Sequence, residues 1–441
     1  MVRIGLMANR NLLTSRRAFI GGLGLTALGA GKPPIAAAAA DEAVRLQAKG
    51  STLALRSGQL ETPVSALIGS TPALRFKLGA TIEIAFKNEL QVPAAINWHG
   101  LDGVPLAEPL TGQSPLASGA TAGVAVPLRH AGTLFGDLGL LAGDVGHPTR
   151  ALALIVDETD PPPVDRDEIL LIEEFRVGPD GTAISPGSDP KNAPPIYTVN
   201  GLISPDIAVH SNQRLRLRFI NAGQRHVVAV KIEGLEVRLM ALDGEPAEPF
   251  FARNSAIVLA PGGRGDAFVD VPLPPGSAAQ ILLHDGKQAR AIGRLIVTDE
   301  APRRAPLTPA PALPQNGLPA QLELKGARRF EIALTGNGWV TPTRFATSAA
   351  PAFRVKAGRI VVLALTNRAL IATVFHLHGH HFRLLDRLDD GWKPYWLDTL
   401  AVEPGQTQRI AFAADYAGRW LIESTPTDWA APKLLRWYSV E

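Results

Sequence analysis

Two proline-rich stretches divide the chain into blocks that are each the size of a single domain. The first begins at residues 161–163, which are three consecutive prolines, and the second runs over residues 301–321. Such segments form stiff, extended linkers, and they leave blocks of roughly 115, 135 and 120 residues, which is ordinary domain size. We therefore expect domains over 41–158, 168–300 and 326–441, joined by linkers over 159–167 and 301–325.

Each block has the residue pattern of β-strands. Polar and apolar residues alternate over 80–86, and residues 360–365 form the continuous apolar run of a more fully buried strand. Over 214–220, arginines alternate with apolar residues, which predicts an outward-facing arginine row on a half-buried strand. Turn signals such as Asp243-Gly244 and Pro404-Gly405 recur between strands. The pattern predicts an all-β protein built from three β-sandwiches in series.

The N-terminus has the composition of an export signal. Arg16-Arg17 is followed by a glycine- and alanine-rich apolar stretch and then by five alanines over Ala36–Ala40. This order predicts a twin-arginine signal peptide over residues 1–40, cleaved within Ala36–Ala40. The apolar stretch is too short and too rich in glycine to span a bilayer. We therefore expect a periplasmic protein that uses the twin-arginine translocase and is not an integral membrane protein.

The basic isoelectric point near 9.2 comes from this leader. Residues 1–40 contain five of the 44 basic residues and none of the 41 acidic ones, so the mature chain has 39 basic residues against 41 acidic ones. A nearly neutral chain has no general attraction for nucleic acid. The chain also has no cysteine, which excludes disulfides, thiolate ligands and thiol nucleophiles.

Four histidine-containing or glycine-rich motifs occur in a recognisable order. They are Asn97-Trp98-His99-Gly100, residues 132–139 (GTLFGDLG), residues 373–382 (TVFHLHGHHF) and residues 418–425 (GRWLIEST). In their order and spacing, the chain over about residues 45–441 resembles the multicopper oxidase family of the three-cupredoxin type. The resemblance implies three consecutive cupredoxin-like Greek-key sandwiches.

The same resemblance implies that the blue-copper site is missing. The position of its cysteine falls on Ser424, those of its histidines on Thr373 and near Trp429, and that of its axial residue near Leu434. A blue-copper centre requires one thiolate and two imidazoles. We therefore expect no blue copper.

At the positions of the trinuclear copper cluster, the resemblance leaves a mixed set of side chains. The predicted metal ligands are His99, His376 and His378, and the further candidates are Asn97, Asp137 and Glu423. Residues two apart on a strand point to the same side, so Asn97 and His99 share a face, as do His376 and His378. The resemblance implies that both pairs face one pocket. Nitrogen and oxygen donors of this kind suit copper, zinc, iron or manganese. His380 and His381 are weaker candidates, and His130, His147, His210, His226 and His284 are isolated and expected to be surface or hydrogen-bonded residues.

Two interpretations remain open. In the first, the chain is a scaffold or interaction protein of the cell envelope with an unknown partner, similar to the copper-free, cell-division-associated branch of the family, and the histidines are held by hydrogen bonds or ion pairs. In the second, it is a metal-dependent oxidoreductase with one metal ion at the former cluster position. Asp137 or Glu423 would then act as a ligand or as a general base.

Overall fold

The computed structural model describes residues 43–141, 147–298, 308–386 and 391–441. All of the described residues belong to one compact unit, Ala40–Glu441. The predicted signal peptide over 1–40 and part of the second predicted linker lie outside the described residues. In the part of the chain that is described, no helix combines the length and the apolar character that crossing a bilayer requires.

The first domain is a sandwich of two sheets. One has the order β6-β4-β1-β2-β8 and consists of β1 (Val44–Leu53), β2 (Thr62–Ile68), β4 (Thr81–Asn88), β6 (Thr121–Pro127) and β8 (Thr149–Arg150). The other has the order β3-β9-β7-β5 and consists of β3 (Ala73–Lys77), β5 (Asn97–His99), β7 (Gly132–Asp137) and β9 (Leu152–Asp157). Leu46 and Ile84 from the first sheet share one buried core with Leu134 and Leu154 from the second.

The second domain repeats this arrangement. One sheet has the order β11-β10-β13-β18-β15-β16 and consists of β10 (Arg166–Arg176), β11 (Pro195–Val199), β13 (Arg214–Asn221), β15 (Arg238–Leu242), β16 (Glu245–Phe251) and β18 (Arg264–Asp270). The other has the order β12-β20-β19-β14-β17 and consists of β12 (Asp206–Val209), β14 (Val228–Ile232), β17 (Ala256–Leu259), β19 (Ala278–His284) and β20 (Ala289–Val297). A 3-10 helix, η2 (Arg253–Ser255), precedes β17. Leu217 and Val269 pack against Val230 and Ile281 across the sandwich.

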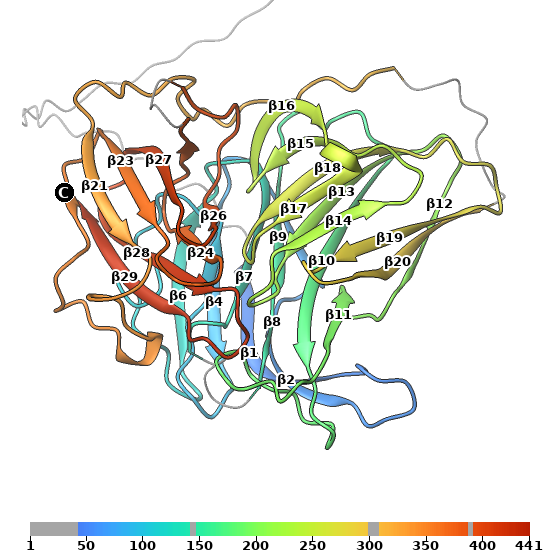
Figure 1. Ribbon diagram of the computed structural model, residues 1–441, viewed down its shortest axis with the longest axis horizontal. Coiled ribbons are helices and arrows are strands. Elements are labelled where there is room, and N and C mark those ends of the chain that lie inside the picture. The colour runs from blue at the N-terminus through green and yellow to red at the C-terminus, as the bar shows by residue number, and fades with distance from the viewer. Residues whose placement is uncertain (1–42, 142–146, 299–307, 387–390) are drawn as a thin grey trace, which may run out of the picture. The chain divides into compact units, whose positions relative to one another are not determined.

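The third domain is also a sandwich (Figure 1, orange and red strands). One sheet has the order β21-β23-β27-β25 and consists of β21 (Arg328–Ala333), β23 (Arg359–Thr366), β25 (Arg383–Leu384) and β27 (Thr407–Ala414). The other has the order β22-β29-β28-β24-β26 and consists of β22 (Arg354–Val355), β24 (Thr373–Leu377), β26 (Thr399–Val402), β28 (Gly418–Pro426) and β29 (Leu434–Val440). A 3-10 helix, η3 (Pro342–Arg344), lies between β21 and β22. The prediction of an all-β chain of sandwiches is therefore confirmed.

Local sequence explains why the strands begin and end where they do. Ile82, Ile84 and Phe86 are the buried positions of β4, as the alternation over 80–86 predicts. Asp243 and Gly244 have φ angles of 48° and 85°. Two successive positive φ angles are what a tight turn between β15 and β16 requires.

The predicted outward-facing arginine row is wrong. Arg216 and Arg218 are fully buried, and Arg214 is only 6% exposed. Arg218 donates through Nη1 to Thr133 Oγ1 of the first domain at 2.9 Å, and Arg216 donates through Nη2 to Asp266 Oδ2 at 2.6 Å. In an isolated sandwich this face would meet water, but here another domain covers it. Buried guanidinium groups require such partners.

Strand register places the sequence-predicted site residues opposite one another. In the antiparallel pair of β5 and β7, Asn97 is opposite Asp137. In the antiparallel pair of β24 and β28, His376 is opposite Glu423. Directly opposite residues point to the same face of a sheet. Each carboxylate therefore lies on the same face as the neighbouring histidine motif.

Candidate functional site

The six residues predicted from the sequence lie together between the first and third domains, with two further charged residues. We call this group the His376 cluster, and its members are Asn97, His99, Glu108, Asp137, His376, His378, Glu423 and Lys433. Lys433 has an 11% exposed side chain, and the others are buried. The carboxylates thus face the imidazoles, and the sequence alone located most of the group.

His99 is held by residues of its own domain. Its Nε2 lies 3.0 Å from Asp137 Oδ2 and 3.3 Å from Asn97 Nδ2. Its ring stacks on Phe135, with ring centroids 4.2 Å apart and planes 3° from parallel. Asn97 Nδ2 also donates to Glu423 Oε1 at 2.8 Å, which links the first domain to the third.

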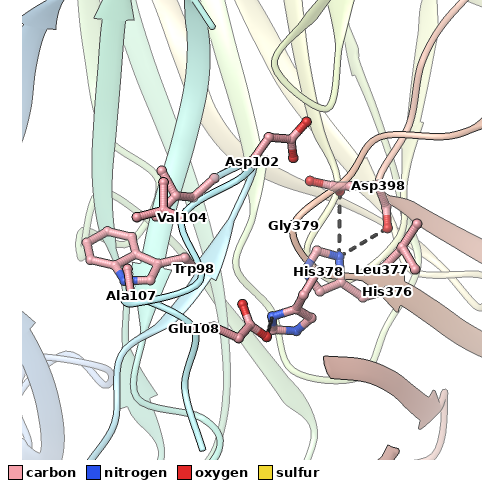
Figure 2. Close-up of a pocket in the computed structure, with 12 residues that line it drawn as sticks. Trp98, Asp102, Val104, Ala107, Glu108, His376, Leu377, His378, Gly379 and Asp398 are labelled. Carbon is pink, nitrogen blue, oxygen red and sulfur yellow. Dashed lines mark hydrogen bonds and ion pairs between the residues drawn. The ribbon is translucent and has the colours of Figure 1, made fainter. Parts of the chain in front are cut away.

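His378 is enclosed by two glutamates, one from each domain. Its Nδ1 lies 3.0 Å from Glu108 Oε1, and its Nε2 lies 3.0 Å from Glu423 Oε1; Figure 2 shows Glu108 against this ring. Burial lowers the pKa of His378, but Glu108 and Glu423 outweigh burial and raise it to about 10. Burial raises the pKa of Glu423, but Lys433 and then His378 hold it well below its usual range. His378 is therefore an imidazolium whose two N–H groups both donate to carboxylates.

His376 is neutral and has one unused nitrogen. Its Nδ1 lies 3.1 Å from the carbonyl oxygen of Asp398 and 2.9 Å from Thr399 Oγ1. A carbonyl oxygen only accepts, so Nδ1 donates and Nε2 keeps its lone pair. Burial and the neighbouring His99 lower the pKa of His376 well below its usual value. The two rings are 4.5 Å apart, and His376 Nε2 has no hydrogen-bond partner.

A small cavity lies beside these rings. Its volume is about 20 Å³, and its lining includes His99, Asp137, His376, Glu423 and Lys433. A space of that size holds about one water-sized group when polar partners are present. His99 Nδ1 is buried without a partner, as is His376 Nε2. Two imidazole nitrogens are therefore open to a ligand here, whereas both nitrogens of His378 are already engaged.

His380, the weaker sequence candidate, lies in the core of the third domain. The hydroxyl of Tyr438 donates to the carbonyl oxygen of His378 at 2.7 Å, so it accepts from His380 Nδ1, which is also 2.7 Å away. The backbone N–H of Tyr416 donates to His380 Nε2 at 3.3 Å. Burial lowers the pKa of His380 to about 4, so the ring is neutral. Both of its nitrogens are engaged, so His380 is not a member of the His376 cluster.

A second buried group lies where all three domains meet. We call it the His381 cluster, and its members are Asp102, His130, Asp243, Glu245, Arg264, His381 and Asp398. His381 Nδ1 lies 2.7 Å from Asp102 Oδ2. In Figure 2 the carboxylate of Asp102 points away from Glu108 and His378, and Asp398, whose Oδ1 lies 3.6 Å from His376 Nδ1, connects the two clusters. Within the described ranges, Asp102, His130 and His381 form the one group of at least three possible metal ligands whose donor atoms lie within 4.8 Å of one another.

Arg264 ties the second domain to its neighbours. Its guanidinium is fully buried and donates to Asp398 Oδ1 at 2.7 Å and to the carbonyl oxygen of Asp243 at 2.6 Å. It also donates to the carbonyl oxygens of Gly262 and Thr133, at 3.0 and 3.1 Å. Burial raises the pKa of Asp398, but Arg264 holds it below its usual range.

The sequence did not identify the charged residues that come from loops or from other domains. Glu108 and Asp102 follow His99 closely, but no strand periodicity links them to it. His130 was predicted to be isolated, and it lies instead beside Asp102 and Glu245. Asp243 was recognised only as a turn residue. The nearness of Asp102 to the first histidine motif was the one available signal.

Comparisons with known proteins agree on one family. Residues 174–277 and 318–440 match family models described as multicopper oxidase. The chain is 26% identical to a multicopper oxidase from Pseudomonas thermotolerans, with a TM-score of 0.77 over 90% of this chain and 98% of that one. It is also 26% identical to Lac15 from a marine microbial metagenome, with a TM-score of 0.75 over 90% of this chain and all of that one. McoA multicopper oxidase from Aquifex aeolicus, at 17% identity and a TM-score of 0.74 over 91% and 96% of the two chains, shares the fold. No curated protein matches the sequence.

Proposed function

Because the chain belongs to the multicopper oxidase family, we propose that it is an exported scaffold or interaction protein of the cell envelope in which buried ion pairs replace the copper centres of that family. One observation carries this proposal: the blue-copper positions that the family resemblance assigns hold no copper ligand. We further propose that the mature protein works in the periplasm with a partner still to be identified.

The side chains at these positions do not fit blue copper. Ser424 Oγ donates to the carbonyl oxygen of Leu334 at 2.5 Å, and Thr373 Oγ1 donates to Asn367 Oδ1 at 3.4 Å. Trp429 is buried, with 2% of its surface exposed. The site needs one thiolate and two imidazoles, and these residues supply neither. Substrate electrons therefore have no blue-copper entry point in this chain.

The trinuclear position also favours a structural role. His378 bridges Glu108 of the first domain and Glu423 of the third with both of its N–H groups. Within the first domain Asp137 lies 3.0 Å from His99, and within the third Lys433 lies 2.7 Å from Glu423. A buried ion pair stabilises only when the geometry is good and the remaining polar atoms are satisfied. This network meets that condition around His378, and it fixes the first domain against the third.

Copper loading of the mature protein tests the proposal. After incubation with Cu(II) and desalting, we expect no intense thiolate-to-copper absorption and no copper-dependent oxidation of phenols. Ser424→Cys should not restore that absorption, because Thr373 and Trp429 supply no imidazole. In cells that lack the gene, the His376→Gln variant should restore the normal phenotype as well as the wild type does. Copper-dependent oxidase activity that disappears in His376→Gln would contradict the proposal.

Export can be tested separately. The leader carries Arg16-Arg17 before an apolar stretch, and the twin-arginine route reads that pair. Replacing both residues with lysine should keep the chain out of the periplasmic fraction, which immunoblotting of cell fractions would show. Normal export of the double variant would refute this part of the proposal.

One specific observation favours a metal-dependent oxidoreductase as a second candidate function. His99 Nδ1 and His376 Nε2 are buried, lack partners and belong to residues that line the cavity of about 20 Å³. These two residues would hold an ion together with Asp137 or Glu423, while the other carboxylate would act as a general base. The ion would supply Lewis-acid or redox chemistry. A chelator-sensitive activity that is lost in both His99→Gln and His376→Gln would support this function over the first.

A further inference from the structure

We propose that a divalent transition-metal ion of the zinc type binds between the three domains, held by Asp102, His130, Glu245 and His381. This site is separate from the positions that the family uses for copper. Asp102 and His130 come from the first domain, Glu245 from the start of β16 in the second, and His381 from the segment after β24 in the third. A bound ion would therefore join all three domains at one point.

The donor atoms are already close together. Asp102 Oδ2 lies 2.7 Å from His381 Nδ1 and 3.6 Å from His130 Nδ1. His130 Nδ1 lies 2.8 Å from Glu245 Oε1. Ligand atoms about 2 Å from a common zinc ion are separated from one another by about 3 Å or slightly more. The donor atoms of Asp102, His130 and His381 lie within 4.8 Å of one another, and Glu245 would complete the set through its contact with His130.

The orientation of His381 leaves the correct nitrogen for the ion. Its Nε2 lies 2.8 Å from the carbonyl oxygen of Asp243, and because a carbonyl only accepts, Nε2 carries the hydrogen. Without an ion, Nδ1 also carries a hydrogen and donates to Asp102 at 2.7 Å, because Asp102 outweighs burial and raises the pKa of His381 to about 10. A bound ion would replace that proton on Nδ1. Metal-bound histidines typically donate their other N–H to a backbone carbonyl or a carboxylate in this way.

His130 and Glu245 supply the observation that points to a missing ligand. His130 Nδ1 and Glu245 Oε1 are 2.8 Å apart, and neither atom makes a hydrogen bond of regular geometry. Glu245 is 2% exposed, and the side chain of His130 is 10% exposed. The other oxygen of Glu245 accepts from Asn316 Nδ2 at 3.2 Å, which holds the carboxylate in place. Two buried electron-pair donors that do not bond to each other require a third partner.

The buried charges around the site also favour the binding of a cation. The carboxylates of Asp102, Glu245 and Asp398 are buried with a single guanidinium, that of Arg264. The carboxylate of Asp243 is compensated by backbone N–H groups of residues 264, 398 and 399. Four buried carboxylates against one guanidinium leave an excess of negative charge, which one divalent ion would reduce. Two protons, one on each histidine, would supply the same charge and are the competing arrangement.

The donor chemistry indicates the class of ion. Two imidazole nitrogens and two carboxylate oxygens form a set that suits zinc, and also manganese or ferrous iron. With protein donors at all four positions, the ion would serve structure, and its binding free energy would stabilise the packing of the three domains.

Zinc titration of the mature, chelator-treated protein tests the proposal. Equilibrium dialysis followed by elemental analysis should find one zinc ion per chain in the wild type. His130→Gln and Glu245→Gln should each weaken binding by at least about tenfold, since the loss of supporting groups alone commonly costs that much. His226→Gln removes a histidine that pairs with Glu174 outside both clusters; it is the matched control and should bind zinc as the wild type does.

Cobalt substitution and folding controls keep the result interpretable. Co(II) in the wild type should give the strong visible bands of a four-coordinate site, and these should be absent from His130→Gln. Glu245→Asp retains the charge, so it should fold normally by circular dichroism and bind zinc more tightly than Glu245→Gln. The proposal is overturned if the wild type binds far less than one zinc per chain, because protons then hold the cluster. It is also overturned if His99→Gln abolishes zinc binding while His130→Gln does not.

Discussion

Replacement of His378 by glutamine should destabilise the protein by about 4 kcal/mol at neutral pH. The imidazolium lies between Glu108 and Glu423 at 3.0 Å from each, and its pKa rises from 6.5 to about 10 on folding. One pKa unit corresponds to about 1.4 kcal/mol, so this shift stabilises the folded state by about 4 kcal/mol at pH 7. The loss of one partner from a buried ion pair typically costs about 3–5 kcal/mol, which agrees.

The pH dependence of this difference has a defined sign. The folded pKa lies above the unfolded one, so the stabilisation is complete below about pH 6.5 and is lost as the pH rises toward 10. The groups that face the ring are Glu108, Glu423 and the neutral ring of His376, whose centroid is 4.6 Å away. The difference in unfolding free energy between wild type and variant should therefore shrink from about 4 kcal/mol at pH 7 to about 1 kcal/mol at pH 9.

Urea unfolding of the mature protein, followed by tryptophan fluorescence, measures these differences. The control is His284→Gln, which removes an exposed imidazole whose Nδ1 accepts from the backbone N–H of Gly286 at 3.0 Å within the second domain. A single hydrogen bond is worth about 1 kcal/mol, so the control should change little. Equal unfolding midpoints for His378→Gln and wild type at pH 7 would refute the assignment of His378 as a buried imidazolium. So would a difference that does not shrink between pH 7 and pH 9.

Two further predictions concern the domain contacts and the backbone. Arg264→Met removes the buried guanidinium shared by the domains and should lower the unfolding free energy by about 3–5 kcal/mol. Arg294→Met, at an exposed ion pair, should cost about 1 kcal/mol or less in the same urea assay. Equal losses for the two variants would contradict the role of Arg264 in joining the domains. Gly379 has a φ of +74°, and a Cβ at this position would lie 2.2 Å from Trp420. Gly379→Ala should therefore lower the unfolding free energy by about 2–5 kcal/mol through backbone strain and overpacking. Gly358→Ala has φ +76 in open space and should cost only about 1–2 kcal/mol, and a similar cost for the two variants would show that the contact with Trp420 is unimportant.

Strand parity explains why the sequence located most of the His376 cluster. His376 and His378 are two residues apart and share a face, and the register of β24 with β28 then places Glu423 opposite His376. Asn97 and Asp137 are related in the same way across β5 and β7. Such pairs depend only on the two-residue period of a strand and on the register between neighbouring strands. Both can be inferred from the spacing of the motifs once the chain is seen to resemble a known fold.

The remaining site residues could not be predicted because packing between domains places them. Asp102 meets His381 across 279 residues of sequence, and no local pattern encodes that contact. The arginine row over β13 was misassigned for the same reason. Alternation shows which face of a strand is polar, but it does not show whether another domain covers that face, as the first domain covers Arg218 here.

The most direct test of the replacement of the copper centres by ion pairs is the copper content of the mature protein. It would be compared with that of a variant that lacks His376, a histidine that the family would use as a copper ligand. The wild type and His376→Gln would be loaded with Cu(II), washed with a chelator, and analysed for copper per chain and for phenol oxidation. We expect both proteins to retain the same amount of copper per chain and to show no oxidase activity. Copper that stays bound to the wild type, supports oxidation and is lost from His376→Gln would contradict the replacement of the copper centres by ion pairs.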